Sequence, residues 1–112
     1  MSTYRHINLH TLAEIEASGN SHAFPVTGAK VGLVARVTAK EGTNPTLDFE
    51  LEWSADGANF VSAASADTLV QLTDVGGEAK SYDAKAPWAR LAWAIGGTAT
   101  PKFTFEAQAV VA

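Results

Sequence analysis

The sequence contains no cysteine and only one methionine, and no apolar run approaches the roughly 20 residues that a membrane-spanning helix needs. Without cysteine, disulfides and thiolate metal sites are excluded, so packing and hydrogen bonds must stabilise the fold. Basic residues are also scarce: 8 Lys and Arg are scattered along the chain against 12 Asp and Glu, and the formal net charge is −4. Because nucleic acid binding requires a clustered basic surface, we expect no nucleic acid partner.

Residues 1–6 lack the apolar core of a secretory signal, so we expect the protein to be made and used without export and to have no membrane partner. Apolar residues make up 46% of the chain and charged residues 18%, which is typical of a globular fold. A chain of 112 residues has the length of one domain. We assign residues 13–112 to a single β-domain, preceded by residues 1–12 as an N-terminal arm or first strand.

Period-2 alternation is the clearest pattern, and it is strongest in residues 46–53. The apolar positions are Leu47, Phe49, Leu51 and Trp53, and the intervening positions are Asp48, Glu50 and Glu52. Successive side chains of a strand point to opposite faces, so this segment predicts a half-buried strand with an acidic outer face.

Similar alternation predicts strands over residues 31–39, 88–95 and 102–110, with shorter candidates at 60–64, 68–73 and 79–83. Glycine-containing turns separate these segments, including Asp56-Gly57, Gly76-Gly77 and Gly96-Gly97. Several short strands between such turns predict an all-β fold, a single antiparallel β-sandwich (jelly-roll or immunoglobulin-like) of about seven or eight strands.

Two connecting segments resemble each other. Residues 39–46 and 94–101 each contain Gly-Thr, a short spacer and proline, and each is followed by an alternating strand with aromatic residues. Proline is tolerated where a strand begins because it donates no ladder hydrogen bond. We therefore predict two similar β-connections at one end of the sandwich.

The first 30 residues have a less regular pattern. Leu9, Leu12, Ala13 and Glu16 fit one face of a helix, whereas Ile7, Leu9 and Leu12 also fit an irregular strand. We favour the strand, and we expect residues 22–26 to be extended. Residues 1–6 are predicted to form a short arm beyond the core.

The candidate chemical groups do not form a recognisable site. His6 and His10 are spaced for a metal only on a helix, and His22 stands apart, so we expect no metal and no cofactor. The acidic side chains of one solvated strand face do not make the cleft of a glycosidase, and no calcium-binding loop is present. No nucleophile elbow, P-loop or dinucleotide fingerprint occurs, so we expect no enzymatic activity and no catalytic residue.

The three tryptophans offer a different possibility, a surface on which sugars stack. Trp53 and Trp93 are in phase with core residues, whereas Trp88 follows Pro87 at a strand start and is predicted to be the most exposed. A carbohydrate-binding module anchored by Trp88 is therefore an alternative function.

Four segments carry a resemblance to a known family: VTA at 37–39, GTNPTLD at 42–48, WSADG at 53–57 and RLAWAIGGTATPKFTF at 90–105. They are similar to segments of capsid decoration or auxiliary head proteins of tailed bacteriophages, and the similarity extends from about residue 18 onward. One extra residue separates Gly-Gly-Thr from proline here. The matching residues are turn and core residues, so they indicate the fold more strongly than the function.

The resemblance implies a non-enzymatic virion structural protein that decorates or stabilises the phage capsid by binding the major capsid protein. It also implies a location on the outer capsid surface after synthesis in the host cytoplasm, and a homo-oligomer such as a trimer. A tail or neck-associated virion protein with the same sandwich is a further alternative. Residues of the types enriched at interfaces suggest the partner-binding set Tyr4, Arg5, His6, Ile7 and Leu9, with Trp88 added.

Overall fold

The structure, a computed structural model, describes residues 4–112, and within them the chain is all-β. The seven strands are β1 (Arg5–Ile15), β2 (Gly19–Asn20), β3 (Phe24–Pro25), β4 (Lys30–Ser54), β5 (Val61–Thr68), β6 (Gly76–Asp83) and β7 (Trp88–Val111). Every pairing between them is antiparallel. In the described part of the chain, no helix is long and apolar enough to cross a membrane.

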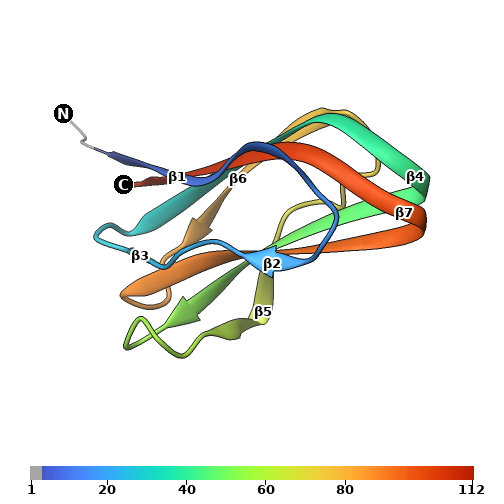
Figure 1. The fold of residues 1–112 in the computed structure, drawn as a ribbon. Helices are drawn as coiled ribbons and strands as arrows, with labels where there is room; N and C mark the ends of the chain where they lie inside the picture. Colours follow the sequence, from blue (N-terminus) through green and yellow to red (C-terminus); the bar gives the residue numbers. More distant parts are fainter. Residues whose placement is uncertain (1–3) are drawn as a thin grey trace.

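Strands β4 and β7 pair along almost their whole length and bend together, so that one sheet folds into two layers (Figure 1). In the first layer, residues 30–41 of β4 lie between β6 and residues 102–111 of β7, and β1 pairs with the far side of β7. In the second layer, residues 46–54 of β4 lie between β5 and residues 88–96 of β7. Strands β2 and β3 complete this layer beside β7. The predicted β-sandwich is confirmed, with its two layers joined through continuous strands.

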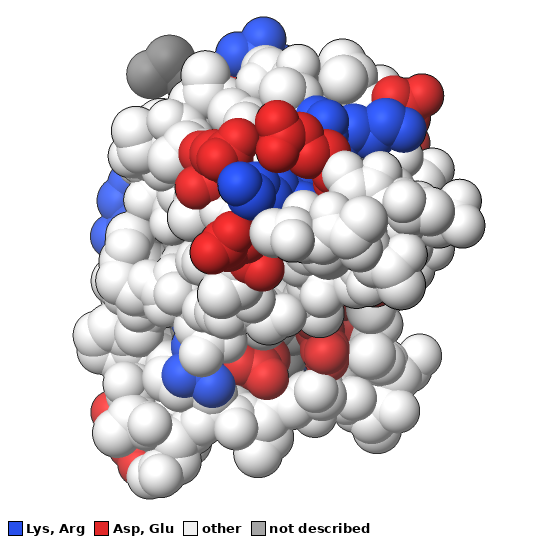
Figure 2. All heavy atoms as spheres, turned by 45° about the vertical axis from the view of Figure 1, so that its right-hand side comes forward, with Lys and Arg blue, Asp and Glu red and all other residues white. Residues whose placement is uncertain are grey.

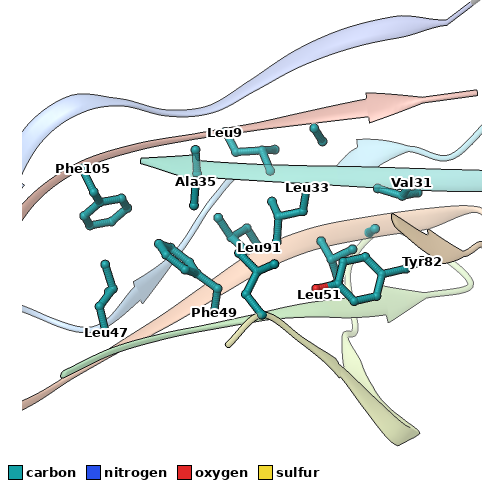
Figure 3. Close-up of a cluster of buried hydrophobic side chains, with 14 of the residues drawn as sticks. Leu9, Val31, Leu33, Ala35, Leu47, Phe49, Leu51, Tyr82, Leu91 and Phe105 are labelled. Carbon is teal, nitrogen blue, oxygen red and sulfur yellow. The ribbon is translucent and has the colours of Figure 1, made fainter. Parts of the chain in front are cut away.

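The core lies between the two layers and follows the predicted alternation. From the first layer come Val31, Leu33, Ala35, Val37, Phe103, Phe105, Ala107 and Ala109, and from the second come Leu47, Phe49, Leu51, Trp53 and Leu91, all of them buried. Figure 3 shows side chains of both layers pointing toward one another. Phe49 and Phe105 meet edge to face across the core, with ring centroids 5.3 Å apart. Burial of these apolar side chains is the main stabilising contribution to the fold.

The two similar connections predicted from sequence lie side by side where β4 and β7 bend. Gly42 and Gly97 occupy the left-handed region, with φ of +104° and +121°. Each glycine also contacts the backbone of the other connection, because a Cβ on Gly42 would lie 2.8 Å from Pro101 Cα and one on Gly97 would lie 3.0 Å from Pro45 Cα. This reciprocal backbone contact, together with the positive φ, explains why both segments contain glycine.

A buried polar network stabilises the second layer. The indole Nε1 of Trp53 donates to Asp67 Oδ2 at 2.8 Å, and Lys85 Nζ lies 2.9 Å from the same oxygen. The nearby Tyr82 hydroxyl donates to the carbonyl oxygen of Thr68 at 2.7 Å. Burial, together with the charge of Asp67, raises the pKa of Tyr82 to about 12. The carboxylate of Asp67 therefore connects strand β5 to the core tryptophan.

We expect Asp67→Ala to lower the free energy of unfolding by about 2–3 kcal/mol, because it leaves the buried indole N–H without an acceptor. Asp83→Ala is the matched control, since it also removes a lysine-paired carboxylate but at an exposed site, and should cost less than about 1 kcal/mol. Urea denaturation of both variants measures the difference. Equal losses would show that the Trp53 hydrogen bond contributes little.

Two predictions of secondary structure need correction. The segment 68–73 was predicted to be a strand, but beyond Thr68 it follows the edge of β4 only through isolated contacts, such as the bridge between Leu47 and Leu72. Residues 1–6 were predicted to form an arm, but Arg5 and His6 belong to β1 and pair with Val111 and Val110. Residues 1–3 of that arm lie outside the described residues. Of the alternatives for residues 7–17, the structure shows a strand as far as Ile15.

Candidate interaction surface

The three histidines do not form a common site. His6 Nε2 lies 2.9 Å from Gln108 Oε1, whereas His22 is exposed on the segment between β2 and β3. The His10 ring stacks on Phe105 with centroids 4.1 Å apart and meets Trp93 edge to face. Within residues 4–112, no group of three His, Asp or Glu side chains is arranged to hold a metal ion.

The acidic row on β4 is less solvated than predicted. Asp48 is exposed and accepts hydrogen bonds from Gln71 Nε2, but Glu50 and Glu52 are half-buried. Glu52 Oε1 lies 2.8 Å from Arg90 Nε, across the β4–β7 pairing. Oε2 of Glu50 is buried and has no hydrogen-bond partner in the described part of the structure. The row therefore lines a partly covered face of the second layer, and its members have different partners.

The tryptophans do not form a sugar-stacking platform. Trp53 is buried in the core, as predicted. Trp93 is half-buried and donates from Nε1 to the carbonyl oxygen of Ala17 at 3.2 Å. Trp88, predicted to be the most exposed, is also half-buried, and its ring lies over Gly57, where a Cβ would be 3.1 Å from ring carbons. Nothing in this arrangement favours carbohydrate binding.

The predicted partner-binding residues of the N-terminal segment divide into two groups. Leu9 is buried in the core, and the half-buried Ile7 packs against the core. Arg5 donates from an Nη to the carbonyl oxygen of Pro25, and Tyr4 is exposed. Because Ile7 and Leu9 face the core, the segment is part of the domain, and of the predicted partner-binding residues in it Tyr4, Arg5 and His6 are exposed.

Charged side chains gather at the end where β4 and β7 bend, with acidic groups around basic ones (Figure 2). Lys102 lies 3.9–4.0 Å from carboxylate oxygens of Glu14, Glu16 and Glu41. Elsewhere on the first layer, Arg36 Nε lies 3.1 Å from Glu106 Oε1. These ion pairs are mostly exposed and contribute little to stability. At the bend, the carboxylates around Lys102 leave no basic surface among the described residues.

An open groove of about 620 Å³ lies on the outside of the first layer. It runs along residues 34–38 of β4 and residues 75–79, which include the start of β6. A second hollow of about 320 Å³ adjoins it and shares Val34 and Ala79. Val34 is 46% exposed and Val75 is 58% exposed. Gly76 and Gly77, which have no side chains, also line the groove and leave its floor recessed.

This groove is the best candidate for an interaction surface. Its lining is mostly apolar, and of its two charged residues, Arg36 and Glu78, Arg36 is paired with Glu106. Catalytic and small-molecule sites combine an enclosed pocket with several convergent polar groups, and this groove has neither feature. An open apolar surface of this kind is typical of contacts with other macromolecules. Sequence reasoning missed it, because its shape depends on the pairing of β4 with β6.

Comparison with known proteins supports the fold. No family model matches the sequence, and the search of curated proteins finds no match. Among solved structures, the chain is similar to part of a protein in the structure of infectious bursal disease virus, Gt strain, with a TM-score of 0.52 and 12% sequence identity. The similarity covers 96% of this chain and 32% of that chain, so the protein spans about a third of its neighbour's length.

At this level of identity the likeness shows the fold alone. The protein is therefore an antiparallel β-sandwich of a kind that also occurs within a larger viral protein. The resemblance to phage capsid decoration proteins stays a prediction, because no family model matches the segments that carry it.

Proposed function

We propose that the protein is a non-enzymatic structural component of a virus particle. More specifically, we propose that it decorates the outer surface of a tailed-phage capsid by binding the major capsid protein. In this proposal it acts without a cofactor and contacts neither nucleic acid nor membrane. The observation that carries the proposal is the open apolar groove on β4 and β6, on which no catalytic groups converge among the residues that line it.

Two further observations support it. The solved structure with a similar fold comes from a virus, although the identity of 12% allows no transfer of function. The sequence segments at 37–57 and 90–105 resemble phage head proteins, and the structure places all of their residues except 55–57 in the paired β4 and β7 strands that form the bend. The groove lies on the outer face of this paired framework, where a capsid subunit could approach without disturbing the core.

The test is co-sedimentation with capsids that lack this protein. We expect the wild-type protein to sediment with them, and Val34→Lys to weaken binding about tenfold or more, because it places a charge in an apolar contact. Val61→Lys is the matched control: Val61 is 66% exposed on β5, away from the groove, and its replacement should leave binding unchanged.

Each outcome has a separate meaning. Failure of the wild-type protein to sediment would contradict the capsid assignment. Wild-type binding by Val34→Lys would remove the groove from the mechanism. Immunogold labelling of purified particles then gives the position, and label confined to the tail or neck would contradict decoration of the capsid.

A further inference from the structure

Strand β6 is a regular, uncovered sheet edge. Its eight residues pair with β4 on one side without a register shift, and within residues 4–112 no strand pairs with its other side. All of its residues except Tyr82 are exposed. An edge of this kind presents unpaired backbone N–H and C=O groups, which can pair with another strand.

The other edges of the described sheet are less suited to pairing. Strand β1 has two register shifts, one on each side of His10, and bulges of this type bend an edge away from a partner. The pairing of β5 with β4 is interrupted between Leu51 and Glu52. Strands β2 and β3 contain two residues each. Among these edges, β6 alone offers a full-length regular template.

The hydrogen-bonding pattern shows which backbone groups of β6 are free. Ala84 N donates to Ala29 O, and these residues stand opposite each other one step beyond the β4–β6 ladder. In an antiparallel pair, hydrogen-bonded and non-hydrogen-bonded positions alternate. Even-numbered residues of β6 therefore bond to β4, and the backbone groups of Gly77, Ala79, Ser81 and Asp83 point outward.

The charges of β6 select one way of pairing two copies. If a two-fold axis passes beside Ala79, the outward backbone N–H and C=O groups of Ala79 in one copy bond to those of Ala79 in the other copy. Glu78 of each copy then stands opposite Lys80 of the other, at the non-hydrogen-bonded positions where side chains are closest. The neighbouring registers that keep the hydrogen bonding are centred on Glu78 or Lys80, and each places like charges opposite one another.

We propose that two copies of this protein pair edge to edge through β6, as a two-fold symmetric dimer with Ala79 at the axis. The partner is a second copy because the order of charges on β6 is complementary to itself, as a symmetric contact requires. The four-stranded first layers join into one eight-stranded layer. The axis stands perpendicular to this layer, so the apolar grooves of both copies lie on the same side and meet beside Ala79. The dimer does not depend on the proposed capsid function.

The contact is modest in size. Eight residues of one strand are fewer than the roughly 20–30 residues per partner of a standard interface, so we expect a dissociation constant between about 1 µM and 1 mM. Sedimentation equilibrium over this concentration range should show a monomer–dimer equilibrium for the wild-type protein. A wild-type protein that remains monomeric at about 1 mM overturns the proposal.

Charge reversal tests the register. Glu78→Lys and Lys80→Glu each place like charges at both symmetric contacts and should weaken the dimer about tenfold or more. The double variant Glu78→Lys with Lys80→Glu restores opposite charges and should return to within about threefold of the wild type. Glu16→Lys, an exposed charge reversal outside β6, is the control and should leave dimerisation unchanged.

Mixing the two single variants gives the sharpest result. Positions 78 and 80 are both lysine in the Glu78→Lys chain and both glutamate in the Lys80→Glu chain. Opposite charges therefore face each other at both contacts, so the mixture should form heterodimers while neither variant dimerises alone. Failure of both the mixture and the double variant to recover dimerisation overturns the Ala79 register.

A backbone variant tests edge pairing without changing charge. Ala79→Pro removes an outward N–H that β4 does not use, so the domain should fold and remain monomeric. Circular dichroism verifies the fold before sedimentation. If Ala79→Pro folds and dimerises like the wild type, the dimer does not form through this edge.

Discussion

Replacement of Leu51 by aspartate is expected to leave the protein unfolded at about 25 °C, because the change places a charge in the core. Leu51 has no exposed surface and lies between the layers, opposite Leu91 of β7 (Figure 3). Removal of a buried leucine side chain alone costs about 2–5 kcal/mol, and an unpaired carboxylate in the core adds a further penalty. The total is comparable with the roughly 5–15 kcal/mol by which small domains are stable. Loss of the β-sheet circular dichroism signal measures the outcome.

Glu50→Gln is the matched control, because it changes the neighbouring residue, on the opposite face of the same strand. The sequence pattern predicted a fully solvated Glu50, for which even Glu50→Lys would be nearly silent, but the structure half-buries this side chain and leaves Oε2 without a partner among the described residues. Glutamine keeps the shape and removes the charge, so we expect stability equal to the wild type or up to about 1 kcal/mol higher. If Leu51→Asp melts like Glu50→Gln, the assigned faces of β4 are wrong.

Alanine at Gly97 is expected to lower the free energy of unfolding by about 2–4 kcal/mol, because the residue combines a strained conformation with a close backbone contact. Its φ of +121° is strained for any residue with a side chain. The added Cβ would also lie 3.0 Å from backbone atoms of Asn44 and Pro45. Because these are backbone atoms of the facing connection, a side-chain rotation cannot relieve the contact. Gly42→Ala should have a similar effect through Pro101.

Alanine substitutions at two other glycines separate the cost of backbone strain from the cost of the close backbone contact. A Cβ on Gly76, with φ of +148°, would meet nothing within 4 Å, so Gly76→Ala should show the conformational cost alone. Gly32→Ala adds a methyl group at an ordinary distance from Val110 and should be close to neutral. Urea denaturation of the four variants ranks them. A loss at Gly97 no larger than that at Gly76 would contradict the close approach of the two connections.

The core could be predicted from the sequence because strand alternation is a local property. The alternation within residues 46–53 and 102–110 places Phe49 and Phe105 on the apolar faces of their strands, and the two rings meet in the core. What local patterns could not show is that residues 39–46 and 94–101 are bends within continuous strands. A turn between two strands and a bend within one use the same residues, such as Gly42 and Pro45. Only the pairing of β4 with β7 distinguishes them.

The N-terminal strand was difficult to predict for a different reason. Its register shifts around His10 interrupt the alternation, so that Leu9 faces the core while Leu12 is 44% exposed. The candidate surface had no sequence signal either. Val34 and Ala79 are distant in the sequence and become neighbours only when β4 pairs with β6. Small residues such as Gly77 are commonly associated with turns, and here one of them keeps a groove open.

The position of β7 at the end of the strand order also affects how the chain can fold during its synthesis. Strand β7 is the pairing partner of β1, β2, β3 and β4, and it runs through both layers, so neither layer can close before residues 88–111 have been synthesised. The pairing of Arg5 with Val111 joins almost the first described residue to almost the last, and such distant contacts make folding slow. On the ribosome, β1 therefore has no strand to pair with until β7 emerges, and β4 can pair only with β5 and β6. The complete two-layered fold then forms as a late event.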